Sequence, residues 1–215
     1  FGILSLAQMF VITTGGIDLS VGSLVGLVGV SAAMMLNKGQ GLPPIAVVLL
    51  CLGIGVAAGL WHGLLISKLD LQPFIVTLCS LFLFRGITRL ITGDQSQGFA
   101  GAYPGLRWFG NGFIGGTIAV PFVILILLAI VIGAYLHFSP AGRHLFALGA
   151  NEEGARFSGI RTDRLKITAY VLCSLITACS GLLLAFKVNS LGPSDFGSFF
   201  ELYAIAGAVL GGCSL

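Results

Sequence analysis

Charged side chains are scarce in this chain of 215 residues, since Asp, Glu, Lys and Arg together make up only 9% of it. A soluble globular domain carries about 25% charged residues, so the composition excludes that class. Acidic residues number eight and histidines three, and they are scattered along the sequence. A membrane-embedded enzyme or a metal site needs such groups to be clustered. We therefore expect no catalytic residues, no metal and no cofactor.

Several motifs are absent as well. The chain has no G-x-x-x-x-G-K-[ST] loop, so any ATP hydrolysis would reside on a separate subunit. Its five cysteines lie inside apolar runs without a C-x-x-C pair, which is typical of small packing residues. The net charge of +3 lies in loops and forms no stripe suited to nucleic acid. The sequence thus predicts neither an enzyme nor a nucleic-acid-binding protein.

Apolar runs make up most of the chain, with 56% hydrophobic residues and a mean hydropathy of +1.03. About 20 consecutive apolar residues cross a bilayer as a helix, and helices satisfy their own backbone groups in lipid. We predict an all-α, polytopic transmembrane helical bundle. The expected helices cover Val21–Leu36, 44–66, 73–91, Val120–Phe138 and 167–186, with the end of another over 1–14 and the start of a last one near Glu201.

The domain organisation predicted from these runs is a single transmembrane permease domain over residues 1–215, truncated at both ends. The chain begins inside one apolar run and stops after about fifteen residues of another, each too short to span. The polar stretch 139–166 holds five of the eleven Lys and Arg residues, and basic loops favour the cytoplasmic side. We expect 139–166 to be a cytoplasmic loop and 67–72 to share its side. The loops 37–42, 93–119 and 187–200 would then lie outside.

A polar break near residues 15–20 interrupts the apolar pattern. Gly15 and Gly16 supply backbone freedom, and Ser20 precedes the helix expected from residue 21. Asp18 is the one acid embedded between apolar runs, where an ionisable group indicates function. It would either cap the following helix or contact a substrate on the translocation path. The sequence leaves the depth of Asp18 in the membrane open.

Two arginines, Arg85 and Arg89, lie four residues apart on one helical face. They would either extend to the outer membrane boundary or form an ion pair inside the bundle, with Asp18 or Asp94 as partner. His62, near the end of its span, is expected to be a packing residue.

Small residues repeat at helical spacing in several spans, a pattern that lets transmembrane helices pack closely. Close packing is the prediction, and lining of a channel is the alternative. The repeats are Gly22, Gly26, Gly29 and Ala33; Gly55, Gly59 and Gly63; Ala169, Cys173, Thr177 and Gly181; and Ala204, Ala208 and Gly212.

The polar stretch contains a predicted short helix that begins after Asn151, a good N-cap. Glu152 and Glu153 fall in its first turn, where the helix dipole favours acids. Gly159 can end it in the left-handed conformation, and Ala155, Phe157 and Ile160 give it an apolar side. Such a helix either lies at the membrane surface or docks into a groove of a partner.

Five sequence blocks resemble, in order, the ribose-type carbohydrate permeases of bacterial ABC importers. They are T-G-G-I-D-L-S-V-G-S from Thr14, Q-P-F-I-V-T-L from Gln72, F-R-G-I from Phe84, S-P-A-G-R-H-L-F-A-L-G-A-N-E-E-G-A-R-F-S-G-I from Ser139 and A-I-A-G-A-V-L-G-G-C-S-L from Ala204. The resemblance implies a multi-pass protein of the bacterial inner membrane that imports a monosaccharide. It also implies cytoplasmic ATP-binding subunits, a periplasmic sugar-binding protein and a second permease copy, either identical or a paralogue.

Importer permeases carry a cytoplasmic E-A-A-x-x-x-G segment, the coupling helix that docks on the ATPase. Glu153, Gly154, Ala155 and Gly159 are similar, although Gly154 replaces the middle alanine and the downstream proline is absent. The ATPase-coupling residues implied by this resemblance are Asn151, Glu152, Glu153, Gly154, Ala155 and Gly159. The alternatives are a related importer for branched-chain amino acids or a sugar-like signal molecule, and a secondary transporter with a broken helix.

Overall fold

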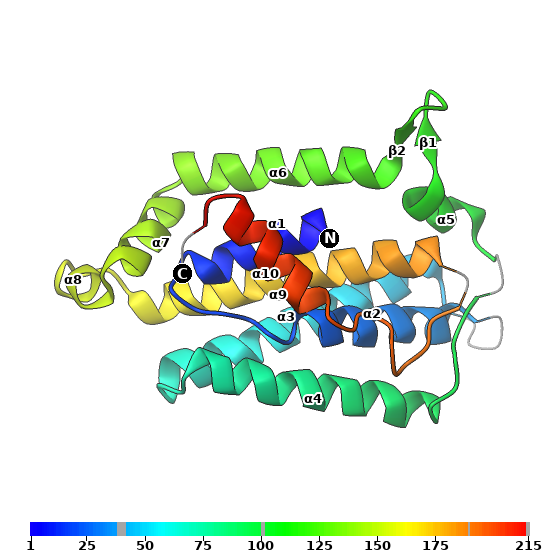
Figure 1. Cartoon of the computed structure of the whole chain (residues 1–215), viewed down its shortest axis with the longest axis horizontal. Coiled ribbons are helices and arrows are strands. Elements are labelled where there is room, and N and C mark those ends of the chain that lie inside the picture. The colour runs from blue at the N-terminus through cyan, green and yellow to red at the C-terminus, as the bar shows by residue number, and fades with distance from the viewer. Residues whose placement is uncertain (38–41, 100–101, 189, 214–215) are drawn as a thin grey trace.

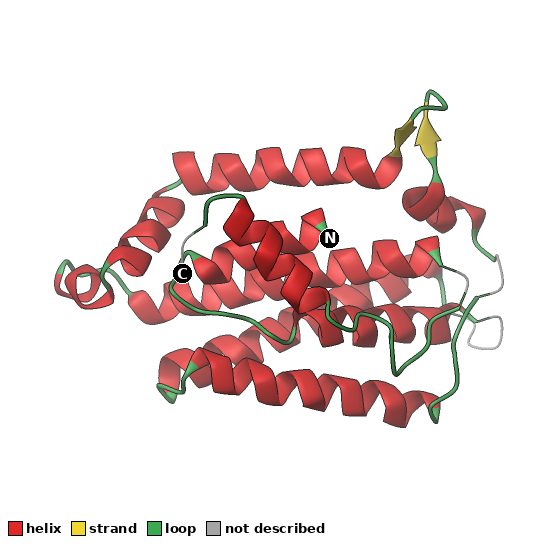
Figure 2. Cartoon of the chain, in the orientation of Figure 1, coloured by secondary structure: helices red, strands yellow, loops and turns green. Residues whose placement is uncertain are grey.

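The computed structural model describes residues 1–37, 42–99, 102–188 and 190–213, and helices dominate it (Figures 1 and 2). Most of the expected loop 37–42 therefore lies outside the described residues. The helices are α1 (Gly2–Ile12), α2 (Val21–Leu36), α3 (Pro44–Lys68), α4 (Pro73–Thr92), α5 (Pro104–Asn111), α6 (Val120–Phe138), α7 (Pro140–Ala150), α8 (Glu152–Phe157), α9 (Thr162–Lys187) and α10 (Phe200–Leu210). A small antiparallel hairpin joins β1 (Phe113–Ile114) to β2 (Ile118–Ala119). This confirms the predicted all-α transmembrane bundle.

Four helices, α3, α4, α6 and α9, are long and apolar enough to cross a membrane. The helices α1, α2 and α10 are apolar but shorter. With a rise of 1.5 Å per residue, the 16 residues of α2 cover about 24 Å, less than the roughly 30 Å of a hydrocarbon core. Helix α2 alone is therefore too short to cross the hydrocarbon core, and any non-helical chain beside it at that depth would have to be surrounded by protein or water.

Helix α9 lies at the centre of the bundle and packs against α1, α2, α3 and α5. Its contact with α3 uses the glycine repeat of that helix. A methyl group added at Gly59 would lie 2.5 Å from the Cα of Val171, and one added at Gly63 would lie 2.7 Å from the Cα of Ile167. Neither glycine can be enlarged without separating the two backbones. The small residues of α3 thus serve close helix packing, as predicted.

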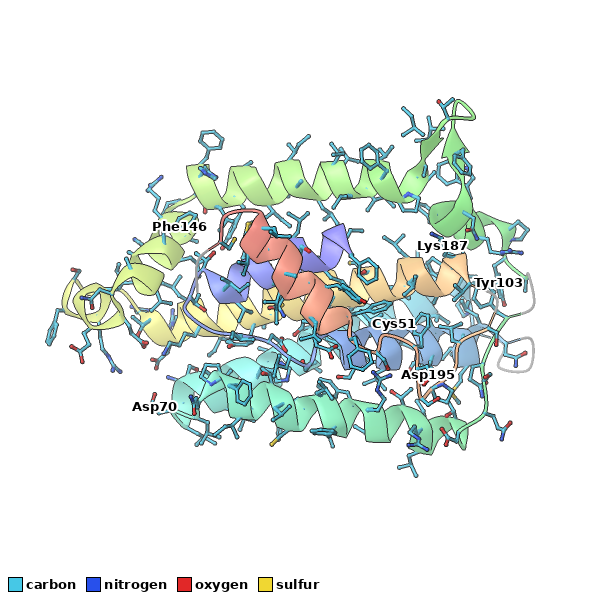
Figure 3. The ribbon with its side chains drawn as sticks, viewed as in Figure 1. Cys51, Asp70, Tyr103, Phe146, Lys187 and Asp195 are labelled. Atoms are coloured by element: carbon cyan, nitrogen blue, oxygen red, sulfur yellow. The ribbon has the colours of Figure 1, made fainter. Side chains whose placement is uncertain are left out.

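The connections between helices gather at two opposite ends of the molecule (Figure 3). Asp70, in the connection from α3 to α4, lies at the same end as Phe146 of α7, whereas Tyr103 and Lys187 lie at the other end. At the first end the ammonium group of Lys68 lies 2.7 Å from the carboxylate of Asp163. The stretches 67–72 and 139–166 thus share one end and 93–119 lies at the other, as predicted. That the end with α7 and α8 faces the cytoplasm stays a prediction from charge.

Two stretches that the sequence predicted as loops contain helices. The polar stretch 139–166 is mostly helical, because Ser139 caps α7 by accepting a hydrogen bond from the Gly142 amide at 3.0 Å, with Pro140 in its first turn. Similarly, the connection 93–119 contains α5 and the β1–β2 hairpin. Within 139–166 the predicted short helix is present as α8, whereas α7 was not predicted. In 93–119 the prediction of a loop without helix was wrong, because α5 begins there with Pro104 in its first turn.

Candidate translocation and coupling site

The predicted break between α1 and α2 is confirmed. The hydroxyl groups of Thr13 and Thr14 donate to the carbonyls of Met9 and Val11, at 2.6 and 2.8 Å, and so satisfy the last turn of α1. Gly15 follows with φ +77°, a conformation that glycine adopts readily. In Figure 1 the chain then runs without helix from the α7 end of the molecule back to the start of α2.

Asp18 is completely buried in this non-helical segment. Its Oδ1 accepts hydrogen bonds from the backbone amide of Ser20 at 2.8 Å and from the Ser20 hydroxyl at 2.7 Å. The expectation that Asp18 caps α2 was wrong, because the capping position belongs to Ser20, itself buried. Asp18 lies two residues earlier and forms a local turn with Ser20.

Side chains from four helices converge on this segment. Gln8 of α1 donates to the backbone carbonyl of Asp18, and Thr77 of α4 donates to the Ile17 carbonyl at 3.3 Å. The Oδ2 atom of Asp18 lies 3.8 Å from Nδ1 of His62 on α3 and 4.0 Å from the sulfur of Cys173 on α9. The break is therefore held by polar contacts from α1, α3, α4 and α9.

The depth of Asp18, which the sequence left open, follows from its neighbours. Cys173 lies eleven residues after the start of α9 at Thr162, or about 16 Å along the helix axis. His62 lies six residues before the end of α3 at Lys68, or about 9 Å along that axis. Asp18 therefore lies between the two ends of the long apolar helices α3 and α9, nearer to the end with α7 and α8.

His62 is a residue whose environment sequence reasoning missed. It was expected to be a lone packing residue, yet its ring is fully buried beside Asp18 and lies 6.1 Å from the ring of Tyr170. A signal was present, because His62 is next to Gly63 in the glycine repeat that contacts α9. The sequence could not show that the Asp18 segment passes the same place.

The short helix α8 has the local structure predicted for it. The Oδ1 atom of Asn151 accepts from the Gly154 amide at 2.8 Å, and Glu152 and Glu153 lie exposed in the first turn. Ala155 is buried, whereas Gly159 is exposed with φ +82°. The ATPase-coupling role of these residues stays a prediction.

The apolar side predicted for α8 is divided in the structure, because Ala155 is buried while Phe157 is exposed. The Phe157 side chain is 90% exposed, next to Arg156 in the last turn. The exposed ring is free to contact either the membrane surface or a groove of a partner, the two alternatives predicted for this helix.

The α7–α8 region lies directly against the helix break. Glu152 and Lys166, whose side chains pair at 2.6 Å, line a cavity of about 200 Å³ together with Gly15, Gly16 and Tyr170. A methyl group added at Gly16 would lie 2.7 Å from the Tyr170 hydroxyl oxygen. The two predicted sites, 120 and more residues apart in the sequence, therefore share one cavity.

A glycine of α7 makes the closest contact between these two regions. A methyl group added at Gly149 would overlap the backbone carbonyl of Thr13, the residue that ends α1. Any displacement of α7 toward α1 is therefore transmitted to the first residue of the break.

The sequence left the two arginines either at the outer boundary or in an ion pair with Asp18 or Asp94, and the structure shows the Asp94 pair for Arg89 alone, at the exposed end of α4. Arg89 pairs with Asp94 in a bidentate contact, at 3.0 and 2.6 Å, but both side chains are about half exposed at the end of α4. This hydrogen-bonded contact lowers the pKa of Asp94. Arg85 pairs with neither Asp18 nor Asp94 and instead donates from Nη1 to the backbone carbonyl of Phe196 at 2.8 Å. Helical spacing placed the arginines on one face but did not show which chain segment lies opposite.

The contact of Arg85 holds the irregular chain before α10 against α2. Methyl groups added at Gly22, Gly26 and Gly29 would meet the Gly197 carbonyl, the Phe196 carbonyl and the Phe196 ring. The glycine repeat of α2 therefore accommodates a non-helical segment, so its predicted role in helix packing was only partly correct.

Comparison with known proteins agrees with this architecture. The family described as branched-chain amino acid transport system / permease component matches residues 1–215. The chain belongs to this permease family. It is 39% identical over 214 residues to the ribose import permease protein RbsC of Bacillus subtilis (strain 168), covering 100% of this chain and 65% of the relative. No solved structure matches the chain.

Two further relatives come from Escherichia coli (strain K12). The galactofuranose transporter permease protein YtfT is 36% identical over 213 residues, which cover 99% of this chain and 61% of the relative. The ribose import permease protein RbsC is 37% identical over 217 residues, covering 99% and 66%. The permease thus spans somewhat less than two thirds of the length of these three relatives. Family membership and the four long apolar helices identify it as a multi-pass protein of the bacterial inner membrane.

Proposed function

We propose that this permease is the transmembrane subunit of an ATP-driven ABC importer that passes a monosaccharide into the cell. The names of its relatives support a sugar, since they specify ribose and galactofuranose. Residues 1–215 would act as one transmembrane domain, with 139–166 on the cytoplasmic side. The substrate class is a monosaccharide of the ribose, galactose or xylose kind.

The observation that carries the proposal is the contact between the α7–α8 region and the broken helix. A coupling element has to touch both an outside partner and a movable part of the path. Helix α8 offers an exposed Phe157 outward, and Glu152 lines the cavity beside Gly15 and Gly16. Closure of an ATPase dimer would push α7 and α8, which would shift the break and open or close the path in alternating access.

The proposal requires three kinds of protein partner. Cytoplasmic ATP-binding subunits would bind α8, and a periplasmic sugar-binding protein would deliver the substrate at the opposite end of the permease. A second permease copy, identical or a paralogue, would complete the path. The lipid bilayer would surround the exposed apolar faces of helices such as α6.

Substitution in α8 tests the coupling step. In proteoliposomes with the ATPase and the binding protein, Glu153→Gln or Gly159→Val should uncouple ATP hydrolysis from sugar uptake while the helical bundle stays folded. Gly159 has φ +82°, so a β-branched residue there strains the end of α8. Wild-type uptake per ATP in both variants would rule out the coupling assignment. Gly133→Ala on α6, where an added methyl meets nothing within 4 Å, is the matched control.

The second candidate substrate is a branched-chain amino acid or a sugar-like signal molecule. The description of the matching family favours the amino acid. Uptake assays with purified binding protein and labelled sugar or leucine separate these substrates. Ion-driven uptake by the permease alone, without ATP, would instead indicate a secondary transporter.

A further inference from the structure

Several polar atoms around Asp18 are buried without a hydrogen-bond partner among the described residues. They are both ring nitrogens of His62, the hydroxyl of Tyr170 and Oε1 of Gln8. All four side chains, Asp18 included, are 0 to 1% exposed. Buried polar groups in native proteins are nearly always paired, so a cluster of this kind requires an explanation.

The charge of Asp18 is the central problem of this cluster. Oδ1 has two hydrogen bonds from Ser20, but Oδ2 faces only the Cys173 thiol at 4.0 Å and Nδ1 of His62 at 3.8 Å. A thiol is a weak donor. Among the described residues no lysine or arginine lies within 4.0 Å of this carboxylate. An isolated buried carboxylate is very costly, so it must be paired or neutralised by a proton.

His62 is the group that can supply this counter-charge. Helices α1 and α4 present Gln8 and Thr77 to the break, and neither titrates. Helix α9 presents Tyr170 and Cys173, which are ordinarily neutral near pH 7. Of the groups facing Asp18, His62 alone ordinarily changes its protonation state near neutral pH.

We propose that Asp18 and His62 together hold one proton and that this pair fixes the broken helix against α3. The proton lies on His62 in an ion pair or on Asp18 in a neutral pair, and the net charge is zero in both. His62 is thus a positioning residue for the break. The proposal deepens the proposed function, because the break is a movable part of the suggested path, but the pair itself does not depend on which solute is carried.

The pair would hold the break against α3. If the break moved away from α3, Asp18 would lose its only nearby base and remain at membrane depth. Separation is therefore favourable only when the carboxyl takes the proton with it or reaches water. This ties movement of the break to the location of one proton.

The test replaces His62 by a neutral side chain of similar length. In His62→Gln the carboxylate has no base beside it, and only an added proton can neutralise it. The thermal unfolding midpoint of the complete permease in detergent should then fall over the whole range from about pH 5.5 to about pH 8, by about 5 °C or more, because only the folded state keeps the proton on Asp18. The unsubstituted protein should begin to fall only above about pH 6.5, where the unfolded histidine loses its proton, and should fall less in total.

A second variant separates the charge effect from packing. Asp18→Asn combined with His62→Gln removes the charge and leaves the glutamine in place, so the midpoint should recover at high pH and lose its pH dependence. The control is His137→Gln, which changes an exposed histidine of α6 and should behave as the unsubstituted protein.

Two results would overturn the proposal. One is a His62→Gln midpoint that does not depend on pH, and the other is a double variant with no recovery. If His62→Gln fails to fold, a folded double variant supports the pair and an unfolded one refutes it. Unfolding is measured without substrate, so failure of sugar uptake in the unsubstituted permease would reject the proposed function and leave this result standing.

Discussion

Two glycines on α3 allow the packing of the bundle to be tested with one substitution at two positions. Gly59 is buried against α9, and an added methyl group would lie 2.5 Å from the Cα of Val171 and 2.7 Å from the Tyr170 carbonyl oxygen. Ordinary van der Waals contacts begin at 3.4 Å, so the backbones of α3 and α9 must separate by roughly 1 Å. Gly53 is exposed, and an added methyl there meets nothing within 4 Å.

The substitution is expected to change the free energy of unfolding differently at the two positions. Overpacking a close contact typically costs about 1–3 kcal/mol, whereas replacing glycine by alanine in a helix gains about 1 kcal/mol. Gly59→Ala should therefore be neutral or destabilising by up to about 2 kcal/mol, and Gly53→Ala should be stabilising by up to about 1 kcal/mol. The difference between the two variants is the quantity that the structure determines.

Unfolding of the purified permease in mixed micelles, with a denaturing detergent as titrant and circular dichroism as readout, measures this difference. Equal stabilisation by both substitutions would mean that α3 and α9 are not in backbone contact at Gly59. That result would also refute the position of His62, which lies on the same stretch of α3.

Two further predictions concern the break and its supports. Gly149→Val should reduce coupled uptake strongly, because its side chain would collide with the carbonyl that ends α1, and uptake with unchanged coupling would contradict this contact. Arg85→Leu should destabilise the permease by about 1.5–3 kcal/mol, since it removes a charged hydrogen bond to the Phe196 carbonyl. The matched control is Arg89→Leu, which breaks an exposed pair with Asp94 and should leave the unfolding curve unchanged, and equal effects of the two substitutions would contradict the assignment.

Local chemistry made α8 predictable. Asn151 is a good cap in any context, acids suit the first turn of a helix, and Gly159 can adopt a positive φ without strain. These preferences act within a few residues, so they could be read without knowing the neighbours. The same local preferences revealed the break at Gly15 and Gly16.

Contacts between distant segments were not predictable in the same way. The partner of Arg85 is a backbone carbonyl in an irregular segment 111 residues later, and carbonyls carry no sequence signature. His62 and Asp18 are 44 positions apart, and nothing in either local sequence indicates that they meet. Helical spacing gives the face of a residue but not the element that covers it.

The sequence by itself determined that this protein is a helical membrane permease, because apolar runs of sufficient length have few other stable states in lipid and because its motifs match one family. It also determined where the break between the first two helices lies and where a short polar helix starts. Only the tertiary structure decided that the break lies buried beside His62 and against α7. The physical reason is that two helices can approach closely only where the small residues of one face the backbone of the other. Which helices meet in this way depends on both segments and cannot be read from either one alone.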